Sequence, residues 1–417
     1  MDHQTVILTL AVIFGFLMAC GIGANDVANA MGTSVGSKVF TLSQAILVAS
    51  VFEFLGAFLA GGEVTGTISK GITDPHFFYA QPEIFIYGML AALLAAATWL
   101  IVASFYGWPV STTHSIVGAI IGFAVITVGP QSVQWSKISL IVASWLVSPI
   151  LGGIVAFLVF NSIQNLILRT EDPFSNAKKY VPIYVFFMGC GISFITLVNG
   201  LKHVGISLNY YQSYGLALIF GGTLFLISKI LLNKVKLDKK ADESFHFTNV
   251  EKIFGIMMIF TACSMAFAHG SNDVANAVGP LAAIVQVLKD PNALNNETIV
   301  PAWILFLGGT GIVVGLATYG YRVIETVGKN ITELTPSRGF SAEISTALTV
   351  VCASGIGLPI STTHTLVGAI LGVGFARGIG ALNLDVLQKI FLSWVVTVPA
   401  GIILTMVLFF IIKTAFA

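Results

Sequence analysis

The stretch GWPVSTTHSIVGAIIG, residues 107–122, returns as GLPISTTHTLVGAILG at residues 357–372. From Pro109 and Pro359 onward, ten of fourteen positions are identical at an offset of 250. In each copy a proline precedes three hydroxyl residues and a histidine, and an apolar run follows. This order of residues predicts a helix that begins at the hydroxyls. The chain therefore contains two polar helix starts in an apolar setting, here called the S-T-T-H motifs (111–114 and 361–364).

A second pair of repeats has nearly the same spacing. GANDVANAMG at residues 23–32 matches GSNDVANAVG at residues 270–279 in eight of ten positions, at an offset of 247. We call residues 25–29 and 272–276 the N-D motifs. Similar offsets at separate landmarks indicate duplication of one unit. We predict transmembrane repeats at 1–168 and 250–417, joined by a segment at 169–249 with two spans and a short cytoplasmic loop.

The composition places the chain in a membrane. Of 417 residues 56% are hydrophobic and 9% charged, whereas soluble domains carry about 25% charged residues. Apolar runs that could serve as spans lie at 5–20, 42–61, 84–105, 138–160, 182–200, 211–232, 252–268, 300–320 and 388–412. We predict an all-α polytopic membrane protein with about 10–12 transmembrane segments. The net charge of +1 gives no reason to expect a nucleic-acid partner.

The count of crossings predicts that the two repeats are inverted. Each unit holds five expected elements, of which the S-T-T-H element is a broken helix or re-entrant hairpin, and the joining segment adds two. If each element crosses once, the copies face opposite sides of the membrane, as in many secondary transporters. The positive-inside rule then places both termini outside the cytoplasm, because two regions that lie two spans apart, and hence on the same side, are rich in basic residues. They contain Arg169, Lys178 and Lys179, and Lys229, Lys234, Lys236, Lys239, Lys240 and Lys252.

The N-D motifs place carboxylates inside apolar spans. A carboxylate at the centre of a span costs about 2.5–3.5 kcal/mol on insertion scales, so two matched copies suggest a function. Carboxylate and amide oxygens are ligands for a hard cation such as Na⁺ or Ca²⁺, and the nearby glycines predict a helix break that exposes further carbonyls. The candidate cation ligands are Asn25, Asp26, Asn29, Asn272, Asp273 and Asn276. The alternative is that these side chains cap a half-helix or hold helices together.

The S-T-T-H motifs are candidates for an anion site. A helix start offers unpaired N–H groups and the positive end of the helix dipole, and neither motif contains Arg or Lys. The candidate anion ligands are Ser111, Thr112, Thr113, Ser361, Thr362 and Thr363. The alternative is that the hydroxyls only cap the helices.

The histidines of these motifs allow two interpretations. His114 and His364 could shuttle protons or, as we favour, orient a neighbouring hydroxyl. His269 has no counterpart in the first repeat, because Ile22 occupies that place.

The charges of the two kinds of motif predict coupled transport. Asp26 and Asp273 supply two negative charges, whereas the two helix starts offset only about half of that. An anion added to this site would be repelled unless cations or protons entered with it. We therefore expect an anion that is co-transported with cations.

With these residues in place, the doubled G-x-N-D-V-A-N-A and P-[VI]-S-T-T-H-x-x-V-G patterns resemble the signature of the inorganic phosphate transporter (PiT) family over essentially the whole chain. The resemblance implies a secondary transporter that imports phosphate by symport with Na⁺ or H⁺ through alternating access. Phosphate would bind at the S-T-T hydroxyls and cations at the N-D motifs. We favour Na⁺ as the coupling ion, with a proton-coupled phosphate or sulfate permease as the alternative.

The resemblance further implies transport-linked roles for Glu53 and Glu343. From the sequence alone, each is an ionisable residue in an apolar stretch or a helix-end residue that faces water. The loop at 233–250 is short where eukaryotic relatives carry a long one, which favours a prokaryotic chain in the plasma (inner) membrane. The expected partners are phosphate, Na⁺ and lipid, with a homodimer as one allowed assembly and no cofactor.

Two other functions are disfavoured. An intramembrane enzyme would need a nucleophile and base, and neither S-T-T-H motif has a known pairing of this kind. An anion channel would commonly build its pore from several subunits, whereas duplication builds a site within one chain.

Overall fold

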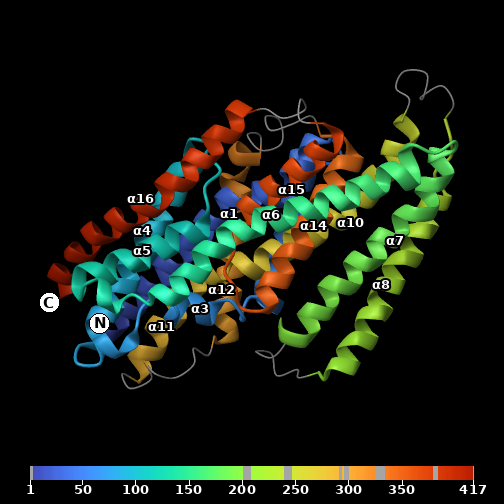
Figure 1. Cartoon of the computed structure of the whole chain (residues 1–417). Helices are drawn as coiled ribbons and strands as arrows, with labels where there is room; N and C mark the ends of the chain where they lie inside the picture. Colours follow the sequence, from blue (N-terminus) through green and yellow to red (C-terminus); the bar gives the residue numbers. More distant parts are fainter. Residues whose placement is uncertain are drawn as a thin grey trace.

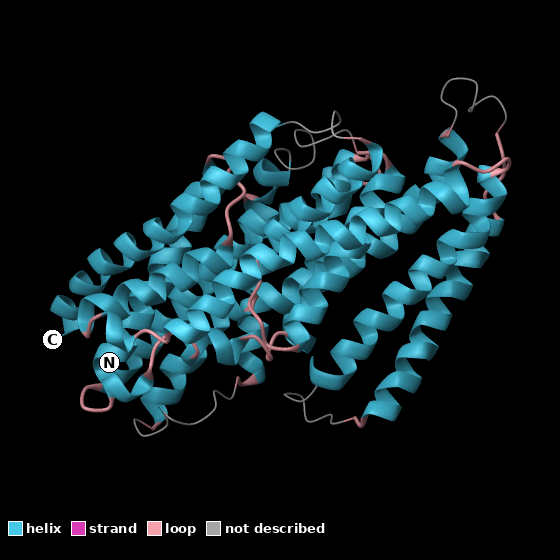
Figure 2. Cartoon of the chain, in the orientation of Figure 1, coloured by secondary structure: helices cyan, strands magenta, loops and turns pink. Residues whose placement is uncertain are grey.

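The computed structural model describes residues 3–200, 208–238, 247–290, 294, 300–324, 334–378 and 384–416. Apart from one isolated bridge between Thr73 and Val133, the regular structure of these residues is helical (Figure 2). The predicted first repeat (1–168) contains α1 (His3–Gly36), α2 (Leu42–Ala60), α3 (Thr65–Lys70), η1 (Pro75–Phe78), α4 (Pro82–Phe105), α5 (Thr112–Thr127), η2 (Pro130–Ser132), α6 (Trp135–Ile163) and η3 (Gln164–Leu168). Then follow α7 (Pro173–Ile195), η4 (Thr196–Gly200), α8 (Tyr210–Asn233), α10 (Thr248–Asp273), α11 (Ala275–Lys289), α12 (Ala302–Thr318), α14 (Pro336–Gly355), α15 (Thr362–Arg377) and α16 (Leu384–Phe416).

Eight helical segments among the described residues are long and apolar enough to cross a membrane. The chain is therefore a multi-pass membrane protein, with eight candidate spans in the described part of the chain where the sequence predicted about 10–12. Beside these eight, α5 and α12 are apolar yet shorter than a full span. The outer faces of long helices carry large apolar side chains, such as Leu146 on α6 and Val395 on α16, which are 67% and 71% exposed. Such faces suit contact with lipid.

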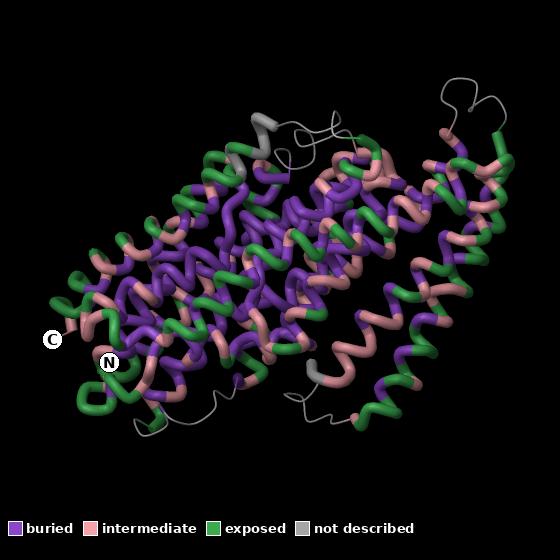
Figure 3. Tube along the Cα trace, in the orientation of Figure 1, coloured by how far each residue is buried: buried purple, intermediate pink, exposed green. Residues whose placement is uncertain are grey.

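The two repeats make matching contacts with each other. α1 packs against α12 and α4, and α10 packs against α2 and α14. In the same way α5 packs against α16, and α15 packs against α6. Several of these pairs join a helix of one repeat to a helix of the other, so the repeats share one buried core (Figure 3). The joining helices α7 and α8 pair side by side at one end of the molecule (Figure 1).

The two described ends of the chain lie together. The rings of His3 and Phe416 are 5.7 Å apart, and Figure 1 places both ends at the same end of the molecule. The connection from α6 to α7 lies at the opposite end in that view. Lys239 and Lys240 of the basic loop fall outside the described residues.

The predicted helix break at the N-D motif is wrong for the first repeat. α1 runs without interruption from His3 to Gly36. In the second repeat α10 ends at Asp273 and α11 begins at Ala275, yet Val274 between them keeps helical angles of φ −57° and ψ −32°. The glycines instead permit close packing, since a Cβ on Gly23 would overlap the carbonyl of Ile312 in α12.

Candidate ion-binding site

The predicted helix starts at the S-T-T-H motifs are confirmed. α5 begins at Thr112 and α15 at Thr362, each after a serine with extended backbone angles. The Ser111 hydroxyl accepts the His114 N–H at 3.3 Å, and the Ser361 hydroxyl accepts the His364 N–H at 3.2 Å. Both serines therefore act as N-caps. Their hydroxyl protons, which capping does not use, can still serve as donors.

The two helix starts meet in the centre of the protein. The Thr113 hydroxyl donates to the carbonyl of Ile360, just before the second start, at 3.0 Å. The Thr363 hydroxyl lies 3.4 Å from the carbonyl of Val110, just before the first. The two hydroxyl-bearing tips, though about 250 residues apart in sequence, thus form one polar centre.

Asn25 ties its N-D motif to the connection between α4 and α5, and Asn272 ties the other motif to α14. The Asn25 amide donates to the carbonyl of Trp108 at 2.9 Å, and its oxygen accepts the Val110 N–H at 3.0 Å. The Asn272 amide lies 2.8 Å from the Ser354 hydroxyl in α14. For these two asparagines, the alternative role of holding helices together describes the contacts seen.

Asn29 of the first N-D motif contacts the S-T-T tip of the second repeat, whereas Asp273 of the second motif contacts the tip of its own repeat. Asn29 donates to Thr363 at 2.8 Å and to Asp26 at 3.0 Å. The Thr362 hydroxyl donates to Asp273 at 2.8 Å.

The reciprocal contact joins Asn276 of the second repeat to the first tip. Its amide lies 3.3 Å from the hydroxyls of both Thr112 and Thr113. The twelve predicted anion and cation ligands are all buried. The candidate ligands for anion and cation, predicted as separate groups, therefore form one cluster.

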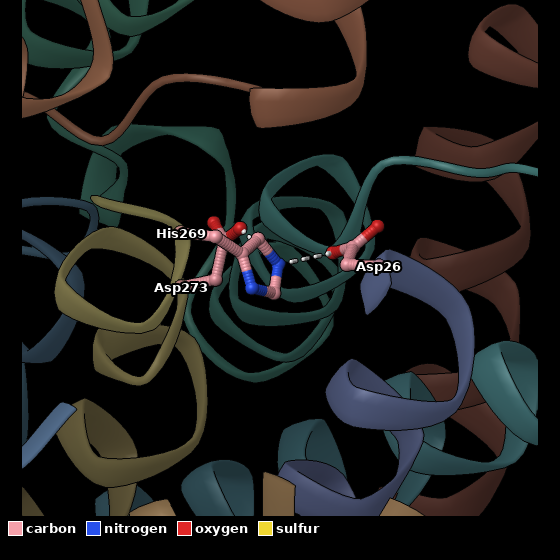
Figure 4. A group of neighbouring side chains, drawn as sticks. All are labelled: Asp26, His269 and Asp273. Carbon is pink, nitrogen blue, oxygen red and sulfur yellow. Dashed lines mark ion pairs between the residues drawn. The ribbon is translucent and has the colours of Figure 1, made fainter. Parts of the chain in front are cut away.

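His269 is a member of this cluster that the sequence reasoning did not include (Figure 4). Its Nε2 lies 2.9 Å from Asp273 and 3.9 Å from Asp26, and its Nδ1 lies 3.3 Å from Glu53. All four side chains are buried. The available signal was an ionisable residue in an apolar span, directly before Gly270. A comparison of the repeats could not reveal it, because the first repeat has Ile22 there.

The packing of the glycines shows that Glu53 also lacks a counterpart. A Cβ on Gly270 would overlap the carbonyl of Glu53, just as one on Gly23 would overlap that of Ile312. Glu53 and Ile312 therefore occupy matching positions, as do His269 and Ile22. His269 of the second repeat and Glu53 of the first thus form an ionisable pair, whereas the matching positions hold two isoleucines, Ile22 and Ile312.

Glu343 forms a separate buried cluster between α14, α1 and α10. Its carboxylate accepts hydrogen bonds from Thr33 and Ser34, both at 2.6 Å, and from Thr261. Neither Glu343 nor Glu53 has any exposed surface. The interpretation of these glutamates as helix-end residues that face water is therefore wrong.

His114 and His364 do not orient hydroxyls with their rings. The ring of His114 lies 3.7 Å from that of Trp145, and the ring of His364 stacks on Trp394 at 3.4 Å between centroids. The two histidine rings are 4.5 Å apart, and His364 Nδ1 lies 3.2 Å from the Trp145 carbonyl. Both rings line an apolar groove of about 920 Å³. None of the twelve candidate anion and cation ligands lines this groove.

Comparison with known proteins identifies relatives along the whole chain. The profile of the phosphate transporter family matches residues 22–405. A putative phosphate permease of Haemophilus influenzae is 51% identical over 418 aligned residues, covering 100% of this chain and 99% of that protein. The chloroplastic inorganic phosphate transporter 2-1 of Arabidopsis thaliana is 44% identical over 97% of this chain and 72% of its own length. A solved structure entitled "The sodium-dependent phosphate transporter" superimposes with a TM-score of 0.91 at 40% identity, covering 98% of this chain and 99% of that one.

Proposed function

The chain belongs to the phosphate transporter family, and on that premise we propose that it imports inorganic phosphate by symport with Na⁺. The observation that carries this proposal is the contact between each N-D motif and the S-T-T tip of the other repeat, made by Asn29 and by Asn276. Anion donors and cation ligands share a single buried cluster, and none of the contacts described above for it involves Lys or Arg.

Phosphate would bind at the two helix starts. The threonine hydroxyls and the free N–H groups of each first turn are donors, and each helix start contributes roughly half a positive charge. Phosphate at neutral pH can also donate a hydrogen bond to a carboxylate, which sulfate cannot. The nearby carboxylates of Asp26 and Asp273 therefore favour phosphate.

The hydrogen bond from Thr362 to Asp273 supplies a mechanism of coupling. A hydroxyl has one proton and can donate it to one acceptor at a time. While Thr362 donates to Asp273 at 2.8 Å, it cannot donate to phosphate. Na⁺ bound to the Asp273 carboxylate would replace this hydrogen bond and release the Thr362 hydroxyl for the anion. Cation and anion would thus favour each other's binding.

Alternating access would arise from two inverted repeats around this cluster. The matching contacts of α1 with α12 and of α10 with α2 support equivalent roles for the two units. We propose repeats at 1–168 and 250–417 and place both termini outside the cytoplasm, on the charge pattern of the sequence. The site would open to either side as the units rock against each other.

Transport in proteoliposomes tests the substrate and the coupling ion. We expect labelled phosphate to accumulate when an inward Na⁺ gradient is imposed, and labelled sulfate to accumulate far less. Phosphate uptake would fall to the level of empty liposomes when Na⁺ is replaced by choline at constant pH. Equal phosphate uptake without Na⁺, driven by a proton gradient, would instead support H⁺ coupling, for which His269 and its three carboxylates offer groups that can bind protons.

The valine variants Thr112→Val and Thr362→Val test the division of roles within the cluster. Each change keeps the side-chain shape and removes a donor. Because a hydrogen bond to a charged group contributes about 1.5–3 kcal/mol, we expect the KM for phosphate to rise at least about tenfold. Sodium dependence should persist in Thr112→Val, whereas Thr362→Val should also alter the Na⁺ affinity through Asp273.

Thr365→Val is the matched control for these two variants. The hydroxyl of this buried residue donates to the Ser361 carbonyl within α15, and we assign it no ligand. Its KM should stay near that of the unmodified protein. An unchanged phosphate KM in Thr112→Val, together with a lost Na⁺ dependence, would reverse the assignment of anion and cation ligands.

A further inference from the structure

The imidazole of His269 lies between two carboxylates that come from different helices. Asp26 belongs to α1, whereas His269 and Asp273 lie one turn apart near the end of α10 (Figure 4). We propose that these three residues form a binding site for a divalent transition-metal ion of the Zn²⁺ class, which blocks transport by occupying the place of the coupling cation. The block rests on the proposed function, whereas metal binding does not.

The three ligand atoms are already close to coordination geometry. One atom from each residue lies within 4.8 Å of the other two. Ligands of a tetrahedral metal at about 2.0–2.1 Å are separated by roughly 3.3 Å. His269 Nε2 is 2.9 Å from Asp273 Oδ2 and 3.9 Å from Asp26 Oδ2. Small side-chain shifts would therefore seat the ion.

His269 and Asp26 also make a contact on the side away from the metal, as ligands in metal sites commonly do. Glu53 lies 3.3 Å from His269 Nδ1, an arrangement that directs Nε2 toward the metal. Asn29 donates to Asp26 Oδ1. Asp26 Oδ2 itself has no hydrogen-bond partner although Asp26 is only 1% exposed. A buried carboxylate oxygen without a partner is free to accept a cation.

The imidazole decides which metals fit. Na⁺, Mg²⁺ and Ca²⁺ prefer oxygen ligands, whereas Zn²⁺ and Co²⁺ bind imidazole nitrogen well. The first repeat offers no such ligand, because Ile22 stands at the position that matches His269. We therefore expect one metal site per chain. Three protein ligands leave a fourth position for water or a phosphate oxygen.

The charge of the cluster favours a divalent ion. Asp26, Glu53 and Asp273 place three carboxyl groups around one imidazole, and all of them are buried. Buried charges of one sign are costly unless they are compensated. A divalent cation on neutral His269 would offset two of the three negative charges while the Glu53 contact remains.

Titration with metal ions tests the site without any transport assay. The full-length protein, purified in detergent and free of Na⁺, is titrated with Co²⁺ and with Zn²⁺. We expect the visible absorption bands of four-coordinate Co²⁺ to appear with one equivalent, and Zn²⁺ to abolish them. His269→Gln should abolish the bands. Glu53→Gln, which removes only the outer partner, should weaken Zn²⁺ binding about 10–100-fold.

His76→Gln is the control, because His76 is exposed in η1, outside the cluster. It should leave the titration unchanged, and size-exclusion profiles would confirm that each variant is folded. Should His269→Gln not fold, Asp26→Asn takes its place, with weaker Zn²⁺ binding expected. Full-strength Co²⁺ bands in folded His269→Gln or Asp26→Asn would overturn the site, as would the absence of bands in the unmodified protein.

Transport measured beside the titration separates this site from the proposed function. We expect micromolar Zn²⁺ to reduce Na⁺-driven phosphate uptake, and excess Na⁺ to weaken Zn²⁺ binding, because both ions use the two aspartates. One-to-one Zn²⁺ binding by a protein that carries no phosphate would leave the site intact and contradict the proposed function. Phosphate uptake driven by Na⁺ without any Zn²⁺ binding would contradict the metal site and leave the proposed function intact.

Discussion

Asp273→Asn and Asp26→Asn should each reduce Na⁺-driven phosphate uptake by at least about 100-fold while the protein still folds and inserts. Each variant keeps the side-chain size and replaces a buried carboxylate by an amide. Removal of one partner from a buried pair of opposite charges costs about 3–5 kcal/mol, and about 1.4 kcal/mol corresponds to a tenfold change. The lost pairing here is the one between Na⁺ and the carboxylate.

The Na⁺ dependence of uptake distinguishes this loss from a general loss of function. The Na⁺ concentration for half-maximal uptake should rise steeply in both variants, and the phosphate KM should rise only because fewer sites hold Na⁺. Asp172→Asn is a suitable control, since Asp172 caps α7 through its contact with the Ser175 N–H at 3.0 Å. It should transport normally. Normal Na⁺ dependence in Asp26→Asn and Asp273→Asn would remove both aspartates from the cation site.

The residue types of the site were predictable from the sequence, but their pairing was not. Repetition singled out twelve polar residues in apolar surroundings, and all twelve are buried in one cluster. Nothing in the spacing of one repeat indicates that Asn29 contacts Thr363, or that Asn276 contacts Thr113. These contacts exist because each N-D helix packs beside the helix start of the other repeat. Such an exchange depends on tertiary packing.

His269 was missed for a related reason. A search for repeated motifs finds residue types that occur in both repeats. His269 and Glu53 occur in one repeat each, and the equivalent positions of the other repeat hold Ile22 and Ile312. The feature that distinguishes the two halves of the site therefore lies outside the repeated pattern. An ionisable residue in an apolar span is informative even without a counterpart, because its insertion is costly.

The glycines beside the N-D motifs led to the wrong prediction of a helix break. Their number indicated a loose or broken helix, yet α1 is continuous through them. In a membrane, small residues also allow helix backbones to approach closely, since packing and not water drives helix association. Gly23 rests against the carbonyl of Ile312 and Gly270 against that of Glu53. The same residue type thus serves close packing here.

Gly270→Ala should therefore lower both stability and transport. A single methyl group at this position would overlap the backbone of Glu53, so α10 and α2 would have to move apart. Overpacking of this kind commonly costs about 1–3 kcal/mol. The shift would also separate Glu53 from His269, the neighbour of Gly270. We expect the midpoint of thermal unfolding in detergent to fall by several degrees and phosphate uptake to fall strongly.

Gly222→Ala provides the matched control on α8, where no atom beyond its own helix lies within 4 Å of an added Cβ. Alanine is favoured over glycine in a helix by up to about 1 kcal/mol, so this variant should unfold at the same temperature as the unmodified protein or above it. If flexibility were the function of Gly270, alanine would stiffen the helix, and the unfolding midpoint would rise in both variants. A fall in Gly270→Ala alone is the outcome that close packing of α10 on α2 requires.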